Sequence, residues 1–230
     1  MKALMPRARR KPRIGTWRRR GHSQPRNNFF PRPMPSSIAL LSGVVLAGGL
    51  STRMGSDKAL VEFEGVPLWR RQYNLIAQAG AADRMLSVRA EQKWPPLDVT
   101  RVVDATPESL GPIAGIAAGL AKSRGSHLLV LAVDMPRVPL AWFARLRERC
   151  SDRIGVIGAR ADGNFEPLAA IYPQAMLPMV RAAVSDRELS LQKLIARAVD
   201  EGFLRVQEIP DAEAVWFENW NDPADVSGQR

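Results

Sequence analysis

The stretch VVLAGGLSTRMGSDKAL, residues 44–60, decides the fold expected for this chain. The apolar run Gly43–Ala47 is typical of a buried parallel strand, and it stops at the glycine pair Gly48 and Gly49. The eleven residues after this pair show no apolar periodicity and carry hydroxyls and two cations. A strand that runs into such a loop brings these groups to its carboxyl end, where open α/β sheets bind ligands. The stretch therefore predicts an α/β protein with a polyphosphate site.

The glycines and the two cations of this loop have separate roles at a phosphate. Glycine lets the backbone approach phosphate oxygens closely, because no side chain intervenes. Arg53 offers a planar fork of donors, and Lys58 offers a compact charge. The spacing matches neither G-x-x-x-x-G-K-[ST] nor G-x-G-x-x-G, which excludes the two commonest nucleotide loops. An ordinary surface loop with solvated charges stays open as the alternative at this point.

The net charge of +10 resides at the amino-terminal end. The first 40 residues hold eleven of the 33 Lys and Arg and no Asp or Glu, so 22 basic and 23 acidic residues remain behind them. Residues 1–37 are predicted to form a disordered basic tail ahead of one folded domain, 38–230. The tail is either an arm that binds nucleic acid or an addition ahead of a true start at Met34, and we favour the second. A signal peptide with its core at Ile38–Leu50 is rejected, because cleavage there would remove the phosphate loop.

Residue counts exclude several classes of function. No apolar run reaches the roughly 18 residues that span a membrane, so we expect a soluble, cytoplasmic protein. The single cysteine, Cys150, excludes an internal disulfide and a cysteine-based zinc site. The two histidines are His22, in the tail, and His127, which is expected to be structural, so a Ser-His-Asp arrangement is not expected. The chemistry should depend on carboxylates, cations and backbone groups.

Strand and helix patterns alternate along the rest of the chain. This alternation predicts a single doubly wound, mostly parallel sheet with helices on its faces. The turn at 161–164 predicts one antiparallel hairpin. The predicted strands are 43–47, 84–89, 99–104, 127–133, 154–159, 168–172 and 203–209. The predicted helices are 67–80, 111–120, 139–150, 175–184 and 189–199, with a last helix starting at Asp222-Pro223.

Two aspartates stand at the ends of predicted strands. Asp134 follows HLLVLAV, residues 127–133, at the edge of the sheet where the phosphate loop also opens. Mg²⁺ prefers one or two carboxylates plus phosphate oxygens, so Asp134 is the first candidate for a metal ligand. Its alternative role is to cap the helix that begins near Pro139. Asp104 ends an earlier predicted strand and is a second candidate for the site. Its alternative role is that of a residue in the turn after this strand.

The segment LAGGLSTRMGSDK, residues 46–58, resembles the signature L-A-G-G-x-S-x-R-M-G-x-D-K of the nucleotidyltransferases that act on the molybdenum cofactor. The resemblance covers about residues 42–226 and implies a Rossmann-like nucleotidyltransferase fold. Relatives that use CTP commonly show L-A-A-G, so Gly49 favours the guanylyltransferase branch. The further segments in the family's order are GPIAG at 111–115, DMP at 134–136, EPLAAIY at 166–172 and NWNDPAD at 219–225.

The resemblance also implies roles for individual residues. Asn219 and Asn221 project to one face of an extended segment, so both amides can enter one site. The family usually has Asn where this chain has Arg89, which can contact a base or a phosphate but lacks the paired donor and acceptor of an amide. The implied catalytic residues are Arg53, Lys58 and Asp134. The implied nucleotide contacts are Leu46, Ala47, Gly48, Gly49, Lys58, Arg89, Asp104 and Asp134. The implied metal ligands are Asp134 and Asn221, and the implied acceptor-side residues are Pro167 and Asn219.

The function implied by this family is transfer of GMP from GTP to the terminal phosphate of molybdopterin or the molybdenum cofactor, with release of pyrophosphate. Mg²⁺ is the implied cofactor, and the nucleophile is already an anionic phosphate. We expect a monomer that binds neither membrane nor nucleic acid and that transiently contacts proteins delivering or receiving the cofactor. The alternatives are a related nucleotidyltransferase that uses CTP or another phosphorylated acceptor, and a non-catalytic nucleotide- or RNA-binding protein.

Overall fold

The computed structural model describes residues 40–49, 57–92, 94, 98–104 and 110–221 of the 230-residue chain. All of these belong to one of its two compact units, Pro33–Arg230. The predicted basic tail, the loop residue Arg53 and the predicted helix at Asp222-Pro223 lie outside the described residues. Within the described ranges, no helix is long and apolar enough to cross a membrane.

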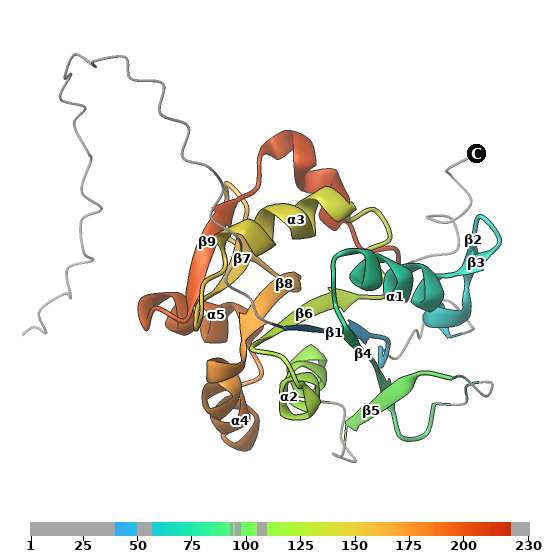
Figure 1. The fold of residues 1–230 in the computed structure, drawn as a ribbon, viewed down its shortest axis with the longest axis horizontal. Helices are drawn as coiled ribbons and strands as arrows, with labels where there is room; N and C mark the ends of the chain where they lie inside the picture. Colours follow the sequence, from blue (N-terminus) through green and yellow to red (C-terminus); the bar gives the residue numbers. More distant parts are fainter. Residues whose placement is uncertain (1–39, 50–56, 93, 95–97, 105–109, 222–230) are drawn as a thin grey trace, which may run out of the picture. The chain divides into compact units, whose positions relative to one another are not determined.

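A seven-stranded sheet forms the centre of this unit, in the order β5-β4-β1-β6-β8-β7-β9 (Figure 1). In the described sheet every pairing is parallel except the two made by β8, with β6 and with β7. The predicted doubly wound, mostly parallel sheet and its one antiparallel hairpin are confirmed. The strands are β1 Leu41–Leu46, β4 Asp83–Arg89, β5 Thr100–Asp104, β6 His127–Ala132, β7 Gly155–Ala159, β8 Phe165–Pro173 and β9 Leu204–Glu208.

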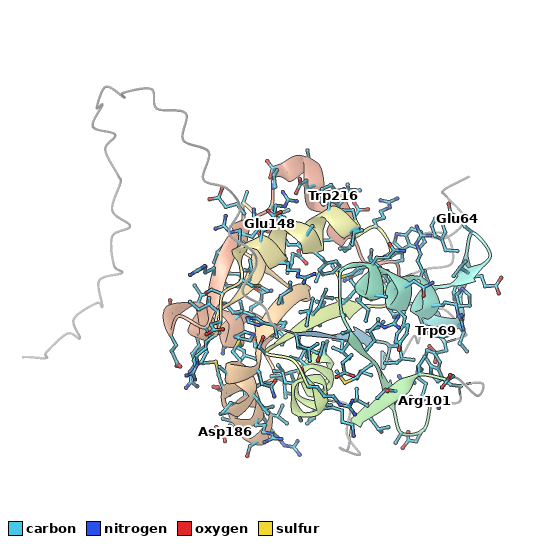
Figure 2. All side chains as sticks on the ribbon, viewed as in Figure 1. Glu64, Trp69, Arg101, Glu148, Asp186 and Trp216 are labelled. Carbon is cyan, nitrogen blue, oxygen red and sulfur yellow. The ribbon has the colours of Figure 1, made fainter. Side chains whose placement is uncertain are left out.

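Helices cover both faces of the sheet (Figure 1). One face carries α1 (Leu68–Gln78) and α3 (Leu140–Arg149), and the other carries α2 (Pro112–Lys122), α4 (Leu177–Ser185) and α5 (Leu191–Asp200). Side chains fill the space between the sheet and each helix layer as two separate hydrophobic clusters (Figure 2). Successive strand residues point to opposite faces, so β1 supplies both clusters and all six of its residues are buried.

The elements that the sequence did not predict are short. They are the hairpin of β2 (Glu62–Phe63) and β3 (Val66–Pro67) and the 3-10 helices η1 (Lys58–Leu60), η2 (Gln174–Met176) and η3 (Asp211–Phe217). Two- and three-residue segments are too short to show a periodicity. Helix α1 begins at Leu68, and Pro67 stands before it as the N-cap residue and not in its first turn.

The strand order places the topological switch point between β1 and β6. From β1 the chain adds β4 and β5 on one side, and it then returns to add β6 on the other side of β1. Open α/β sheets bind ligands outside the carboxyl ends of the strands at such a point. Gly48 lies two residues after the end of β1, and Asp134 lies two residues after the end of β6. The fold therefore brings these two segments to one edge of the sheet.

Candidate active site

Three polar side chains from distant parts of the chain meet beyond the ends of β1 and β6. Lys58 Nζ lies 3.3 Å from Asp134 Oδ2 and donates a hydrogen bond of 2.9 Å to Asn221 Oδ1. The side chains of Lys58 and Asp134 are 12% and 24% exposed, so the ion pair is shielded yet still reached by solvent. The expectation that these two residues lie side by side is confirmed.

Asp134 is held by main-chain contacts that leave its carboxylate for the site. Trp220 N donates to the Asp134 carbonyl at 2.8 Å. The fully buried Gln72 donates from Nε2 to the Met135 carbonyl at 2.7 Å, which ties the turn after β6 to helix α1. The alternative role of Asp134 as a helix cap is wrong, because α3 has Pro139 at its N-cap and no side-chain cap.

Lys58 is held by the short helix η1. Asp57 caps this helix, and its Oδ1 accepts the Ala59 N–H at 3.1 Å. Ala59 is fully buried in the cluster beneath α1, so the backbone that carries Lys58 is anchored in the core. The Asp57 cap and the buried Ala59 thus fix the backbone of Lys58, whose long and flexible side chain has to place its ammonium group beside Asp134.

Asn221 reaches Lys58 because Trp220 anchors the segment that carries it. Trp220 is buried and packs edge to face against Phe63, with 4.8 Å between the two ring centroids. Arg137 lies over the same indole, with its guanidinium carbon 5.9 Å from the ring centroid. Asn219 is exposed, and its carbonyl accepts a hydrogen bond from Asn221 Nδ2 at 3.4 Å. The structure therefore brings Asn221 to the ammonium and leaves the Asn219 side chain exposed beside it.

Gly48 and Gly49 differ from the other described glycines. Each of the others either has a positive φ or stands where an added Cβ would come within 3.0 Å of a protein atom. A Cβ at Gly48 would meet its nearest atom at 3.6 Å, and a Cβ at Gly49 would meet no described atom within 4 Å. Neither packing nor backbone conformation explains glycine here. No described atom would have to move for a ligand to approach the Gly49 backbone closely.

Arg89, the last residue of β4, contacts the glycine pair, and Gln92 contacts the residue before the pair, Ala47. Arg89 Nη1 donates to the carbonyls of Gly48 and Gly49 at 2.9 and 2.6 Å. Gln92 Nε2 donates to the Ala47 carbonyl at 2.9 Å. The sequence did not point to Gln92, because it belongs to no motif.

Gln72 was also missed, although it carries a signal that could have found it. It lies on the apolar stripe of α1 between Leu68 and Ile76, where a polar residue needs a partner.

Asp104 and Pro167 lie at the same edge of the sheet but on other strands. Asp104 is the last residue of β5 and pairs with Arg89 of β4, while its side chain is outside the described part. Pro167 lies in β8, two residues before Ala169, which pairs with Leu131 near the end of β6. The first half of β8 therefore lies beside the carboxyl end of β6, on the side away from β1.

The remaining candidates for acid–base or thiol chemistry are structural. His127 is buried, and its ring nitrogens lie 3.0 Å from Ser126 Oγ and 3.2 Å from the Ile154 carbonyl. Burial lowers the pKa of His127, which favours the neutral imidazole. Burial raises the pKa of the Cys150 thiol to about 12, so it is not a nucleophile near neutral pH. The expected structural role of His127 is confirmed.

The donor set suits Mg²⁺ in company with a polyphosphate. Among the described residues, no group of three or more His, Cys, Asp or Glu gathers as a self-sufficient metal site. The Asp134 carboxylate and the Asn221 amide oxygen both lie at the Lys58 ammonium, and both are the hard oxygen donors that Mg²⁺ prefers. Mg²⁺ characteristically takes one or two protein carboxylates and completes its shell with water and phosphate oxygens. The residues present therefore fit such an ion.

Comparison with known proteins gives consistent matches over most of the chain. The family model described as MobA-like NTP transferase domain matches residues 43–202. A probable molybdenum cofactor guanylyltransferase of Opitutus terrae is 40% identical over 200 residues, which cover 86% of this chain and 98% of that protein. A molybdenum cofactor guanylyltransferase of Pseudomonas fluorescens is 36% identical over 161 residues, 69% of this chain and 78% of that protein.

Solved structures share the fold at lower sequence identity. The molybdopterin-guanine dinucleotide biosynthesis protein A from Archaeoglobus fulgidus matches with a TM-score of 0.61 and 22% identity, over 81% of this chain and 95% of that chain. A nucleotidyl transferase from Methanothermobacter thermautotroptrophicus matches with a TM-score of 0.65 and 19% identity, over 84% of this chain and 96% of that chain. At these identities the structures support the architecture alone.

Proposed function

This chain belongs to the MobA-like NTP transferase domain family, and from this premise we propose that it transfers GMP from GTP to the terminal phosphate of molybdopterin or its molybdenum-bearing form. The products are pyrophosphate and the guanine dinucleotide form of the cofactor. The relatives of 40% and 36% identity bear the name molybdenum cofactor guanylyltransferase, which supports this choice among nucleotidyl transfers.

The observation that carries the proposal is the meeting of Lys58, Asp134 and Asn221 at the switch point of the sheet. A cation, a carboxylate and an amide lie there near a glycine pair, and no described atom lies within 4 Å of a Cβ built at Gly49. This combination fits a magnesium-bound triphosphate, whose charge needs both cations and backbone N–H groups.

The reaction needs no activated nucleophile from the protein. An oxygen of the acceptor's terminal phosphate attacks the α-phosphorus of GTP in line, and the bond from that phosphorus to the oxygen bridging to the β-phosphate breaks. Backbone groups from Leu46 to Gly49 hold the nucleotide, while Lys58 and the loop residue Arg53 stabilise charge on the departing pyrophosphate. The protein mainly orients two anions and offsets their repulsion.

Asp134 and Asn221 are the residues that would hold Mg²⁺ in this site. When bound, the ion neutralises phosphate charge and reduces the repulsion between nucleophile and substrate. Lys58 lies within 3.3 Å of the Asp134 carboxylate and keeps that side chain oriented in the free protein. Asp104 completes the nucleotide side of the proposed site, Arg89 adjoins that side through the Gly48 and Gly49 carbonyls, and Pro167 and Asn219 belong to the acceptor side.

A nucleotide competition assay tests the proposal. Purified protein is supplied with molybdopterin, Mg²⁺ and radiolabelled GTP, CTP or ATP, and nucleotide transfer to the acceptor is measured. We expect transfer from GTP, with kcat/KM for CTP and ATP lower by on the order of 100-fold or more. Preferential use of CTP would show that the protein is a cytidylyltransferase and not a guanylyltransferase. If no nucleotide is transferred, molybdopterin is not the acceptor.

Gly49→Ala is expected to remove most of the activity without disturbing the fold. The added methyl meets no described atom within 4 Å, so Tm should stay near that of the wild type. It would stand where the triphosphate approaches the backbone, and we expect KM for GTP to rise by about 10-fold or more. Thermal unfolding and steady-state kinetics measure both effects.

Gly65→Ala is the matched control for this variant. Gly65 has a φ of 73° in the β2–β3 turn and likewise has no described atom near its Cβ position. Alanine there should cost about 1 kcal/mol of stability and leave KM unchanged. Normal KM in Gly49→Ala would show that no ligand approaches this glycine.

The proposal extends to the setting of the enzyme. We place it in the cytoplasm as a monomer that contacts cofactor-delivering and cofactor-receiving proteins transiently. The proposed reaction uses GTP and molybdopterin together as substrates, and this requirement supports an intracellular site of action.

A further inference from the structure

We propose that Arg89 and Gln92, called here the clasp, are positioning residues that orient the N–H groups of Gly48 and Gly49 toward the triphosphate. The clasp acts through the backbone of the glycine pair and does not read the base. The inference rests on the proposed nucleotide site and identifies what holds that site in shape.

Arg89 turns its guanidinium toward the glycine backbone. Its Nη1 donates to the carbonyls of both Gly48 and Gly49, and a Cβ built on Gly48 would lie 3.6 Å from Arg89 Cγ. These bonds are charge-assisted, which makes them about twice as strong as bonds between neutral groups. Arg89, at the end of β4, therefore stabilises the backbone of the loop that begins at the glycine pair.

Gln92 ties the two ends of the loop together. Its Nε2 donates to the Ala47 carbonyl, at the start of the loop, and to Asp57 Oδ2, at its end. Its Oε1 accepts the N–H of Arg89 at 3.0 Å, so one amide uses both its donor and its acceptor capacity. The same Asp57 caps the helix that carries Lys58. The clasp thus links the glycine pair to the catalytic lysine.

Peptide geometry turns these contacts into an orientation. In a trans peptide the carbonyl and the N–H of the next residue point in opposite directions. With the Ala47 and Gly48 carbonyls held by Gln92 and Arg89, the N–H groups of Gly48 and Gly49 point away from the clasp. No hydrogen bond joins either N–H to another described group, so both donors remain for a ligand.

The charge of Arg89 adds to this effect. A cation at the carbonyl end of a peptide polarises the group, and hydrogen-bonded chains strengthen one another cooperatively. The N–H groups on the far side therefore become better donors to an anion. This account gives Arg89 a role in phosphate binding without a direct contact to the nucleotide.

The first experiment compares binding of GTP, CTP and inorganic triphosphate by wild-type protein and Arg89→Ala. A clasp that orients backbone donors predicts that Kd rises by about 10- to 100-fold for all three, with their ratios unchanged. In kinetics, KM should rise more than kcat falls, because these donors hold the triphosphate before and during reaction. A selective loss of GTP binding would overturn the proposal and make Arg89 a base contact.

Arg84→Ala is the matched control. Arg84 lies five residues earlier on β4, and its guanidinium carbon lies 4.7 Å from the centroid of the Tyr73 ring, on the opposite end of the strand. Its removal should leave all three Kd values unchanged.

The second experiment uses charge to test the Gln92–Asp57 contact. Gln92→Glu keeps the size of the side chain but sets two carboxylates against each other, so triphosphate binding should weaken by about 10-fold or more. Adding Asp57→Asn restores a donor between the two positions and keeps a competent helix cap. We expect the double variant to recover at least half of the lost binding free energy.

The outcomes separate this inference from the proposed function. If neither Arg89→Ala nor Gln92→Glu changes any Kd while wild-type protein binds GTP and transfers GMP, the clasp is overturned and the function stands. If triphosphate binding changes as expected but no GMP reaches molybdopterin, the clasp stands and the acceptor assignment fails. Failure of the double variant to improve on Gln92→Glu contradicts the link to Asp57.

Discussion

Asp134→Ala should lower GMP transfer by on the order of 10³-fold or more, which makes it the most damaging single change we expect. The substitution removes the one carboxylate that contacts Lys58 in the described site, and with it the proposed carboxylate ligand of Mg²⁺. Transfer is measured with saturating GTP and acceptor, and GTP binding is measured with and without Mg²⁺. Binding by the variant should respond much less to Mg²⁺, because the Asn221 amide oxygen is then the one proposed protein ligand left beside substrate and water oxygens.

The fold should survive this change. An ion pair reached by solvent contributes about 1 kcal/mol or less, and the turn after β6 is held by the Trp220 and Gln72 main-chain contacts. Glu213→Gln is the matched control, because it breaks the Arg145–Glu213 pair of similar exposure, 32% and 20%, outside the site. That variant should keep full activity. Substantial transfer by Asp134→Ala would remove Asp134 from the mechanism.

Lys58→Ala should lower kcat by about 100- to 1000-fold. The ammonium lies within 3.3 Å of Asp134 and 2.9 Å of Asn221, so its removal leaves a partly shielded carboxylate uncompensated beside an incoming triphosphate. Two effects then act together, since charge on the leaving pyrophosphate is no longer stabilised and the site repels its substrate. Steady-state kinetics should show kcat and kcat/KM both reduced.

Two further variants define what Lys58 does. Lys58→Arg keeps the charge but replaces a compact ammonium by a larger planar group, so only partial activity is expected. Lys193→Met removes an exposed lysine of α5 and should leave the kinetics unchanged. Equal activity of Lys58→Ala and wild type would mean that the Lys58–Asp134 contact serves stability alone, and unfolding measurements would then show the loss.

Much of the architecture could be read from local patterns. The runs Gly43–Leu46 in β1 and Leu128–Ala132 in β6 are apolar without interruption, because both faces of these central strands are covered by helices. Glycine and proline marked most helix ends, as at Gly80, whose φ of 92° fits the end of α1. The hairpin β2–β3 and the helix η3 were missed because their short sequences carry no period.

The candidate site divides in the same way. Its motif residues Lys58 and Asp134 stood out from their residue types and their places after strands. Gln92 did not, because its importance depends on where the Ala47 carbonyl and Asp57 lie in space. The sequence also did not predict that the Arg89 side chain contacts the Gly48 and Gly49 carbonyls, because the residue type alone does not determine the partner of its charge.

By itself, the sequence determined the alternation of strands and helices, the phosphate loop and the family, because each depends on residues that are neighbours along the chain. Only the tertiary structure decided that Lys58 meets a carboxylate 76 residues away and an amide 163 residues away. It also decided that the clasp supports the glycine pair from behind. Such contacts depend on strand order and helix packing, which bring together segments whose local patterns carry no record of one another.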